Sequence, residues 1–187
     1  MSKKSLILQV TLELITEKGI ENTSLTDIIK ASGVANGTLY HHFKKKEEII
    51  DELYESLTQD FGIVVMRNSD TTEDPRKQYQ IMWLNLYHYF IDNPIAFVFS
   101  EQIGRSPQIP MRLKEKCRVF YTVIEAFFKK RIKEKKFRQF NTLVMQELFF
   151  GSVVSIVKIH ENELVELEER HVKQAIEISW KGFCREE

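Results

Sequence analysis

The amino-acid sequence predicts an all-α protein of about nine helices, and three observations favour this fold class. The 187-residue chain contains only four prolines and seven glycines, so few positions interrupt a helix. Long segments carry apolar residues three and four positions apart, which is the spacing of a helix with one buried face. The strict alternation of apolar and polar residues that is typical of strands is missing from the sequence.

The first helix is expected to end at Lys18 and Gly19. Leu6, Val10 and Leu14 form one apolar stripe ahead of these two residues. A cation in the last turn followed by a glycine is a common end of a helix.

Two short helices joined by a glycine turn are expected within residues 24–46, SLTDIIKASGVANGTLYHHFKKK. Ser24 can cap the first of them, and Asp27 can complete a capping box three residues later. Gly33 supplies the left-handed residue that ends this helix, and the next helix starts near Ala35 or Asn36. With the first helix, this arrangement predicts an N-terminal three-helix domain of the helix-turn-helix type, a DNA-binding motif.

Further helices are expected along the rest of the chain. Two glutamates after Lys46 favour a helix start there, and the polar run from Arg67 to Asp74 predicts a linker before Pro75. Apolar periodicity predicts the remaining helices at about residues 75–92, 95–99, 113–132, 141–160 and 165–184. We place the functional boundary earlier, between a DNA-binding domain of residues 1–47 and a helical ligand-binding and dimerisation domain of residues 48–187.

Composition argues against several other classes of protein. Lysine plus arginine and aspartate plus glutamate each total 27, and 43% of the residues are hydrophobic, so the chain can bury a core and any basic surface must be local. Cys117 and Cys184 lack metal-binding spacing, so we expect reduced thiols and no metal or cofactor. With neither a signal peptide nor an uninterrupted apolar run of about 18 residues, we expect a cytoplasmic protein that does not enter a membrane.

The first turn of the predicted third helix suits contact with DNA. Asn36, Gly37 and Thr38 are short and leave room for close approach to base edges. Asn36 is the candidate base reader, because its amide can form two hydrogen bonds with adenine.

Later residues of the same segment carry groups that suit the DNA backbone. Tyr40, His42 and Lys46 can donate hydrogen bonds to phosphate oxygens, and His41 would reach a base or a sugar. Neighbouring side chains on a helix project about 100° apart, so the two histidines are not expected to bind a metal.

Residues 25–34 (LTDIIKASGV), 37–43 (GTLYHHF) and 46–48 (KEE) resemble the N-terminal signature of TetR/AcrR-family transcriptional regulators. The order, spacing and glycine positions agree over roughly the first quarter of the chain. The resemblance implies that residues 35–42 lie in the major groove and that phosphates are held by Ser24, Thr26, Thr38, Tyr40, His42 and Lys46. It also implies a homodimer on a pseudo-palindromic operator in double-stranded DNA.

Ala35 departs from the family pattern, in which serine or a similar polar residue stands at this position. The missing hydroxyl leaves two roles open for Asn36, which can cap the helix or read a base.

An effector site is expected among the aromatic residues in the middle of the chain, with core packing as the alternative for each of them. Helix bundles hold ligands between helices, where apolar side chains surround a few polar groups. The candidate residues are Trp83, Tyr87, His88, Phe99, Gln102, Phe120, Tyr121 and Gln146, with Glu101 and Arg105 as further polar candidates.

The last two predicted helices carry apolar stripes that would meet a second copy of the chain in a four-helix interface. The candidate interface residues are Phe149, Ser152, Ile156, Ile176, Trp180 and Phe183. Packing of the two helices on each other within one chain is the alternative, and both arrangements can hold at once.

Seven of the ten residues from Lys129 to Arg138 are basic. The cluster ends a predicted helix, where cations are favourable, and an acidic run can balance it (Glu161, Glu163, Glu166, Glu168 and Glu169). We therefore interpret the cluster as a solvated or ion-pairing face rather than a second nucleic-acid contact.

Together these features predict a ligand-responsive DNA-binding regulator, a repressor released from its operator by a small, largely apolar effector. No nucleophile–base pair or phosphate-binding loop can be assembled from the sequence, so we expect no enzyme activity. The alternative is a helical small-molecule carrier or enzyme whose N-terminal helices are structural.

Overall fold

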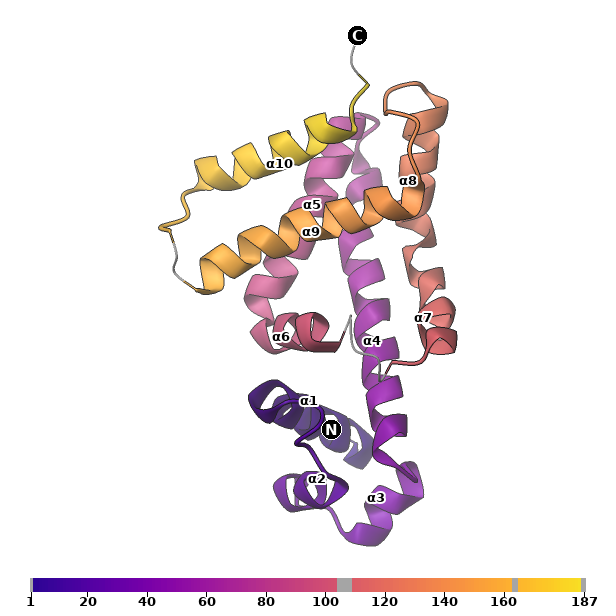
Figure 1. The fold of residues 1–187 in the computed structure, drawn as a ribbon, viewed down its shortest axis with the longest axis vertical. Coiled ribbons are helices and arrows are strands. Elements are labelled where there is room, and N and C mark those ends of the chain that lie inside the picture. The colour runs from indigo at the N-terminus through magenta and orange to yellow at the C-terminus, as the bar shows by residue number, and fades with distance from the viewer. Residues whose placement is uncertain (1, 104–108, 163–164, 186–187) are drawn as a thin grey trace. The chain divides into compact units, whose positions relative to one another are not determined.

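The computed structural model describes residues 2–103, 109–162 and 165–185, and within these ranges the regular elements are all helical (Figure 1). The helices are α1 (Lys3–Lys18), α2 (Leu25–Ser32), α3 (Asn36–His42), α4 (Lys46–Met66), η1 (Ser69–Thr71), α5 (Pro75–Asp92), α6 (Pro94–Ile103), α7 (Met111–Cys117), η2 (Arg118–Tyr121), α8 (Thr122–Lys133), α9 (Thr142–Glu161) and α10 (Glu169–Phe183). The predicted all-α fold class is confirmed.

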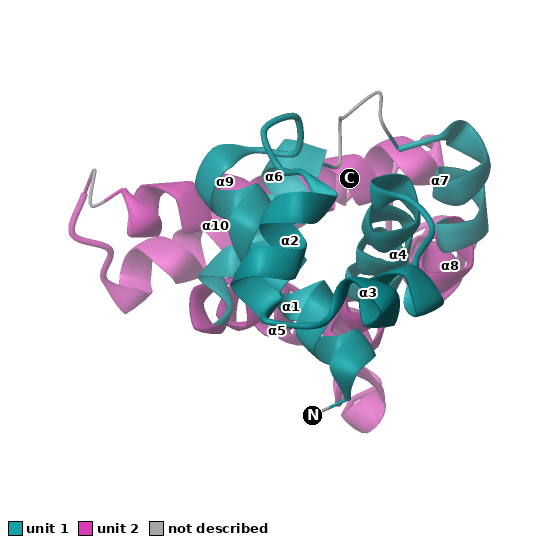
Figure 2. Cartoon of the chain, turned by 90° about the horizontal axis from the view of Figure 1, so that it is seen from below, with its two compact units in different colours: residues 1–59, 93–117 teal, residues 60–92, 118–187 magenta. Residues whose placement is uncertain are grey.

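The chain divides into two compact units (Figure 2). Unit one comprises residues 1–59 and 93–117, and unit two comprises residues 60–92 and 118–187. Unit one therefore contains the predicted helix-turn-helix together with α6 and α7.

In unit one, α1 packs on α2, α3 and α6. Ile7 and Ile15 of α1, Ile28 of α2 and Leu39 of α3 are fully buried. Residues eight apart on a helix share one face, so the two isoleucines of α1 serve the same core. This core sets the positions of α2 and α3 relative to α1.

Unit two is built around α9, which packs on α5, α8 and α10. Its core is rich in aromatic side chains that meet edge to face. The ring centroids of Tyr79 and Phe149 lie 5.4 Å apart, and those of Phe128 and Phe183 lie 5.3 Å apart. This geometry is favourable for aromatic pairs, so the aromatic load of the middle of the chain is used largely in packing.

The segment expected as one helix over residues 113–132 is instead α7, η2 and α8. Gly62 of α4 lies against the backbone of η2, and a Cβ atom at this glycine would stand 2.3 Å from the carbonyl oxygen of Phe120. The interruption therefore coincides with a close tertiary contact. The spacing of apolar residues in this segment does not predict that contact.

α4 runs without a break from Lys46 to Met66 and so crosses the predicted boundary between residues 47 and 48. The two compact units are distinguished by which helices pack together. The predicted boundary instead divides the residues expected to bind DNA from those expected to bind the ligand and form the dimer. The boundary stays a prediction.

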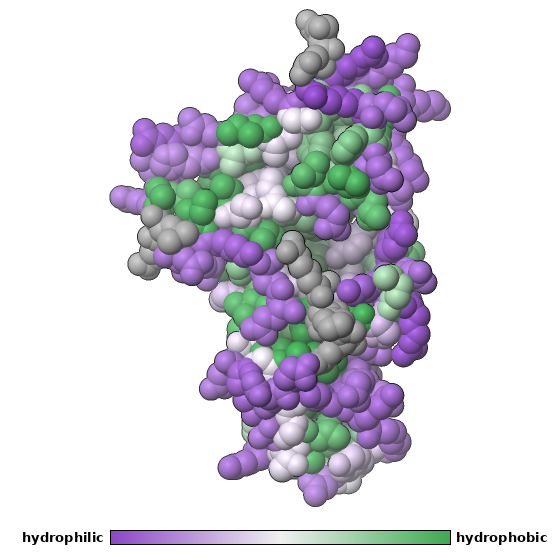
Figure 3. Space-filling model, viewed as in Figure 1, coloured by the Kyte–Doolittle hydropathy of each residue, from purple (hydrophilic) through white to green (hydrophobic). Residues whose placement is uncertain are grey.

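Among the described residues one helix, α9, is long and apolar enough to cross a membrane. In unit two it buries Met145, Phe149 and Val153 against neighbouring helices. Its exposed residues include Leu143, Val144 and Leu148, and Figure 3 shows apolar side chains over the region of α9 and α10. The apolar composition of α9 therefore serves a core on one side and leaves an uncovered apolar surface on the other.

Candidate nucleic-acid interface

The start of α2 is fixed by the capping box that the sequence predicts. The Ser24 hydroxyl accepts a hydrogen bond from the Asp27 amide at 3.1 Å, and the Ser24 amide and hydroxyl donate to Oδ2 of Asp27 at 3.0 and 2.7 Å. Nζ of Lys18 lies 2.9 Å from the same oxygen. Hydrogen bonds from Ser24 and from Lys18 hold the pKa of the Asp27 carboxyl well below its usual range.

This arrangement changes the interpretation of Ser24, which we expected to hold a phosphate. Its hydroxyl proton already points to the Asp27 carboxylate, so a phosphate oxygen would have to displace that bond. Ser24 thus positions α2, whereas Thr26 on the first turn is exposed.

The turn between α2 and α3 follows the predicted geometry. Gly33 has a φ of 64° in the left-handed region, which glycine adopts without a steric cost, and its amide donates to the carbonyl of Ile29 at 3.0 Å. Val34 is buried directly after the turn. These residues set the point at which α3 begins.

α3 buries Leu39 and presents polar residues to the surface. Tyr40 has 45% of its surface exposed. The predicted contact residues Asn36, Gly37, Tyr40, His41 and His42 are all exposed, and Thr38 is half-buried. The helix therefore has a polar face that the core of unit one does not use.

The two roles left open for Asn36 are separated by the geometry of α3. Ala35 occupies the N-cap position and makes no capping hydrogen bond through its side chain. Asn36 is the first helical residue, and within the described part of the chain its amide makes no hydrogen bond. The amide is therefore not used for capping.

The lysines after α3 differ in what they contact. Nζ of Lys44 donates to the carbonyl of Tyr40 at 2.6 Å and so caps the C-terminus of α3. Nζ of Lys46 donates to the carbonyl of Ile20 at 2.9 Å, so this expected phosphate ligand also joins the start of α4 to the loop before α2. Lys45 is exposed, and the sequence alone does not distinguish it from the two lysines on either side.

The neighbouring histidines of α3 lie with ring centroids 5.1 Å apart in an edge-to-face arrangement. Across residues 2–103, 109–162 and 165–185, no three His, Cys, Asp or Glu side chains gather in a group able to hold a metal ion.

The candidate effector residues of unit two include a buried aromatic pair. The rings of Trp83 and Tyr87 stack at 5.5 Å. Nε1 of Trp83 donates to the Ser152 hydroxyl at 3.0 Å, and the Tyr87 hydroxyl lies 3.1 Å from Nδ1 of His160. These polar groups are satisfied within unit two, so Trp83, which is fully buried, packs in the core.

The other effector candidates are divided between the two units. Phe99, which is buried, and Gln102, which is exposed, belong to unit one. His88 is exposed on unit two, and its ring lies edge to face with that of Tyr87 at 5.3 Å. The remaining candidates belong to unit two: Phe120 and Tyr121 are half-buried, and Gln146 is buried. Glu101 is exposed, and Arg105 lies outside the described residues.

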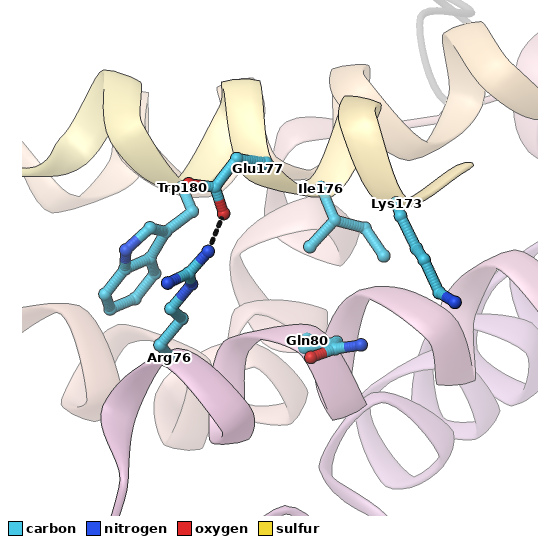
Figure 4. Close-up of a pocket in the computed structure, with 6 residues that line it drawn as sticks. All are labelled: Arg76, Gln80, Lys173, Ile176, Glu177 and Trp180. Atoms are coloured by element: carbon cyan, nitrogen blue, oxygen red, sulfur yellow. Dashed lines mark hydrogen bonds and ion pairs between the residues drawn. The ribbon is translucent and has the colours of Figure 1, made fainter. Parts of the chain in front are cut away.

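A groove of about 220 Å³ lies between α5 and α10 in unit two (Figure 4). The Arg76 guanidinium pairs with the Glu177 carboxylate across it. Burial raises the pKa of Glu177, but hydrogen bonds from Arg76 and Lys181 outweigh that effect and lower it. The ion pair links the two helices, and the groove contains none of the effector candidates. The residues that line it are Arg76, Gln80, Lys173, Ile176, Glu177 and Trp180.

Three of the six expected dimer-interface residues lie on the inner faces of α9 and α10. Phe149 is 0% exposed, Phe183 is 5% exposed and Ile176 is 7% exposed, so these three belong to the core of their own protomer. Their assignment to an interface is corrected, because helical periodicity does not tell which of two apolar faces meets the core. Ser152, Ile156 and Trp180 are half-buried.

The basic cluster makes ion pairs other than the expected ones. Lys129 pairs with Glu125 at 2.8 Å, and Arg131 and Lys136 pair with Glu134 at 3.2 and 3.7 Å. In the acidic run, Glu168 and Glu169 pair with cations near them on their own helix, and Glu163 lies outside the described residues. Three of the seven cations thus pair with Glu125 and Glu134, which lie close to them in the sequence and outside the acidic run.

Comparisons with known proteins agree on one family. Residues 7–53 match the family model for bacterial regulatory proteins of the tetR family, and residues 75–184 match the model for a Tetracyclin repressor-like C-terminal domain. The fold is similar to that of a tetR family transcription regulator from Shewanella sp. PV-4, with a TM-score of 0.92 at 20% identity and coverage of 100% of both chains.

Two curated relatives match over shorter segments. The chain is 28% identical over 101 residues to an uncharacterized helix-turn-helix-type transcriptional regulator of Haemophilus influenzae, an alignment that covers 54% of each chain. It is 38% identical over 52 residues to the transcriptional repressor KstR2 of Mycobacterium tuberculosis, covering 28% of this chain and 26% of that protein. The alignments span about half of the first relative and about a quarter of the second.

Proposed function

The chain belongs to the TetR family of bacterial regulatory proteins and is a transcriptional regulator with a DNA-binding helix-turn-helix, and from this premise we propose that it is a homodimeric repressor released from its operator by a small ligand. The observation that carries the proposal is the exposed polar face of α3, on which Asn36, Tyr40 and His42 are all exposed. A helix whose polar face is left open by its own domain is suited to the major groove.

The proposed roles along α3 follow from side-chain chemistry. The side-chain amide of Asn36, which makes no hydrogen bond within the described residues, reads a base. Two hydrogen bonds to adenine would favour adenine over another base by about 1 to 3 kcal/mol. Gly37 allows close approach to the DNA, and His41 contacts a base or a sugar. Thr26, Thr38, Tyr40 and His42 hold phosphates, which fixes the protein on the duplex without reading its sequence.

Two lysines next to α3 complete the proposed phosphate contacts. Lys45 is added to the set because its side chain is exposed. Lys46 remains a proposed phosphate ligand. Its ammonium has three donors, and the hydrogen bond to the carbonyl of Ile20 uses one of them.

The proposed dimer uses the exposed side of α9 and the neighbouring surface of α10. Leu143, Leu148 and Ile178 are 45%, 55% and 73% exposed, and Gly151 of α9 is exposed near them in sequence. Burying such apolar surface against a second copy is favourable, and a two-fold axis would place two copies of α3 on two half-sites. The half-sites would lie about 34 to 36 Å apart, or a whole multiple of that distance.

The proposed effector binds within residues 48–187 and never needs to touch DNA. It acts by binding more tightly to the conformer whose two α3 helices are wrongly spaced. The half-buried candidates Phe120 and Tyr121, with the buried Gln146 beside Tyr121, remain the proposed contacts. KstR2 carries the name of a repressor, which supports that role here. We propose a cytoplasmic location, because a regulator of this kind must reach chromosomal DNA.

The test is the binding of purified protein to a labelled fragment of the DNA upstream of its own gene, followed by fluorescence anisotropy. Asn36→Ala should relax the preference at one base pair in each half-site, whereas Tyr40→Phe should weaken binding to all sequences alike. Gln139→Ala, an exposed change on unit two, serves as the control and should leave binding unchanged.

Two outcomes would count against the proposal. Equal weakening on every sequence by Asn36→Ala would remove the base-reading role from this residue. Failure of the wild-type protein to bind any DNA fragment more tightly than an unrelated one would favour the alternative, a small-molecule carrier or enzyme.

A further inference from the structure

In unit one, α7 lies beside α4 (Figures 1 and 2), of which residues 46–59 belong to that unit. Two ion pairs join the helices. A guanidinium nitrogen of Arg112 lies 3.6 Å from Oδ2 of Asp51, and Nζ of Lys116 lies 2.6 Å from Oε1 of Glu55. The partners are four residues apart on each helix and their numbers rise together, so α7 runs parallel to α4 in a defined register.

Apolar residues on both helices follow the same four-residue spacing. Leu113 and Cys117 of α7 are 7% and 1% exposed. α4 buries Ile49, Leu53 and Leu57, each one turn after the last. This row lies about 200° round α4 from Asp51 and Glu55, so the ion pairs, and not apolar contacts with this row, define the register of α7.

α4 carries one more acidic residue at this four-residue spacing than α7 carries cations. Glu47 stands four residues before Asp51, is exposed, and makes no hydrogen bond or ion pair within the described residues. Glu47, Asp51 and Glu55 thus offer three positions at four-residue spacing to the two cations of α7.

We propose that α7 occupies two registers along α4, one helical turn apart. In the register of the structure, Arg112 pairs with Asp51 and Lys116 with Glu55. In the second register, α7 is displaced by about 5.4 Å towards the start of α4, where Arg112 meets Glu47 and Lys116 meets Asp51. Both ion pairs exist in both registers, so the displacement changes their partners and not their number.

The four residues of η2, Arg118–Tyr121, supply the length that this displacement requires. In a 3₁₀-helix four residues span about 8 Å, and in extended form they span about 13 Å. The difference of about 5 Å matches one turn of an α-helix. Extension would also withdraw the carbonyl of Phe120 from its close contact with Gly62.

The exposed ion pairs are suited to exchange. The side chains of Arg112 and Lys116 are 81% and 62% exposed, and exposed ion pairs are individually weak. Neither register is therefore locked, and small changes in charge would shift the balance between them. A one-turn shift of one element past another is a known kind of switching transition.

The register would reach the DNA-binding surface through α4, which starts directly after the Lys44 cap of α3. This consequence rests on the proposed DNA-binding function. If the two registers differ in how α4 is held, they differ in operator affinity, and a ligand that prefers one of them would regulate binding.

The test uses methyl relaxation-dispersion NMR on the full-length protein, with Leu113 as the probe of α7. Removing one pair from the register of the structure by Glu55→Gln should raise the population of the second register and increase the exchange contribution at Leu113. Glu47→Gln should lower that population and flatten the dispersion. Glu52→Gln is the matched control, because Glu52 pairs with Lys4 of α1 at 2.7 Å and lies outside the row.

A response of Leu113 to Glu47→Gln but not to Glu52→Gln would support the two registers, since Glu47 makes no hydrogen bond or ion pair within the described residues. Flat dispersion at Leu113 in both the wild type and Glu55→Gln, or equal responses to Glu47→Gln and Glu52→Gln, would overturn them.

Operator affinity provides a separate readout. Glu47→Gln and Glu55→Gln should move the dissociation constant in opposite directions, each by several-fold. If the NMR result holds and both affinities stay unchanged, the link to DNA binding is wrong and the two registers stand. If the wild type binds no operator, the proposed function fails while the NMR result is unaffected.

Discussion

Asp27 sets the start of α2 by accepting hydrogen bonds from Ser24 and the Lys18 ammonium. These contacts lower the pKa of its carboxyl from 3.8 in the folded state. A group whose pKa is lowered on folding contributes stability above its unfolded pKa, and this contribution is lost as the pH falls towards the folded pKa. The capping box should therefore be intact at neutral pH and fail only in acid.

Asp27→Asn tests this pH dependence. The variant should have a lower melting temperature than the wild type at pH 7, because the amide cannot replace the ionised acceptor. The difference should be the same at pH 7 and pH 5 and smaller at pH 3, because below pH 3.8 the carboxyl of the unfolded chain takes up a proton while the folded one stays ionised. Thermal unfolding followed by circular dichroism at the three pH values measures it, and a constant difference at all of them would contradict the assigned role of the charge.

Sequence reasoning identifies contacts that are local in the chain and misses those that are not. Ser24 and Asp27 are three residues apart, so their capping box follows from spacing alone. Lys46 and the carbonyl of Ile20 are 26 residues apart, and only the packing of α1 against the following helices brings them together. The phosphate role of Lys46 was therefore predicted without its structural one.

The break between α7 and α8 likewise coincides with a non-local contact that the sequence does not predict. The apolar residues from Leu113 to Ile132 keep a helical period, yet Arg118–Tyr121 form a 3₁₀-helix. The close approach of the Phe120 carbonyl to Gly62 joins segments almost sixty residues apart. By contrast, α5 begins at Pro75 and ends at Asp92 as predicted, since a proline marks its start and Asn93-Pro94 marks its end.

Gly62→Ala tests the contact between α4 and η2. The added Cβ would lie 2.3 Å from a backbone oxygen, so the backbone must shift, and we expect a loss of about 1 to 3 kcal/mol in the free energy of unfolding. Gly182→Ala on α10 is the control. A Cβ atom there meets nothing within 4 Å, and alanine favours a helix by up to about 1 kcal/mol. Urea unfolding measures both variants, and equal effects would refute the contact.

α9 has one apolar face that the protomer covers and another that it leaves open. The sequence indicates that both faces are apolar, but periodicity alone does not distinguish a core from an interface. The expected interface residue Phe149 is fully buried, whereas its neighbour Leu148 is 55% exposed. The proposed dimer therefore depends on Leu148 and not on Phe149.

Leu148→Asp should separate the two copies without unfolding them. A carboxylate in an apolar interface is strongly unfavourable, whereas the same change on an exposed site costs the protomer little. Light scattering after size-exclusion chromatography should give about half the wild-type mass. Phe149→Ala should instead lose about 3 to 5 kcal/mol of stability in urea unfolding. A dimeric Leu148→Asp protein would move the interface elsewhere.

The proposed DNA-binding surface is the exposed face of α3 with the residues beside it, which would contact the phosphates and bases of duplex DNA. Each phosphate contact releases counterions, so the logarithm of the binding constant must fall linearly with the logarithm of the salt concentration. Lys45→Ala removes one proposed contact and should reduce that slope by about 1.

The most direct measurement is therefore the salt dependence of binding to the upstream DNA for the wild type and Lys45→Ala. We expect a steep slope for the wild type and a shallower one for the variant. Binding that is independent of salt, or identical slopes for the two proteins, would contradict the proposed phosphate contacts.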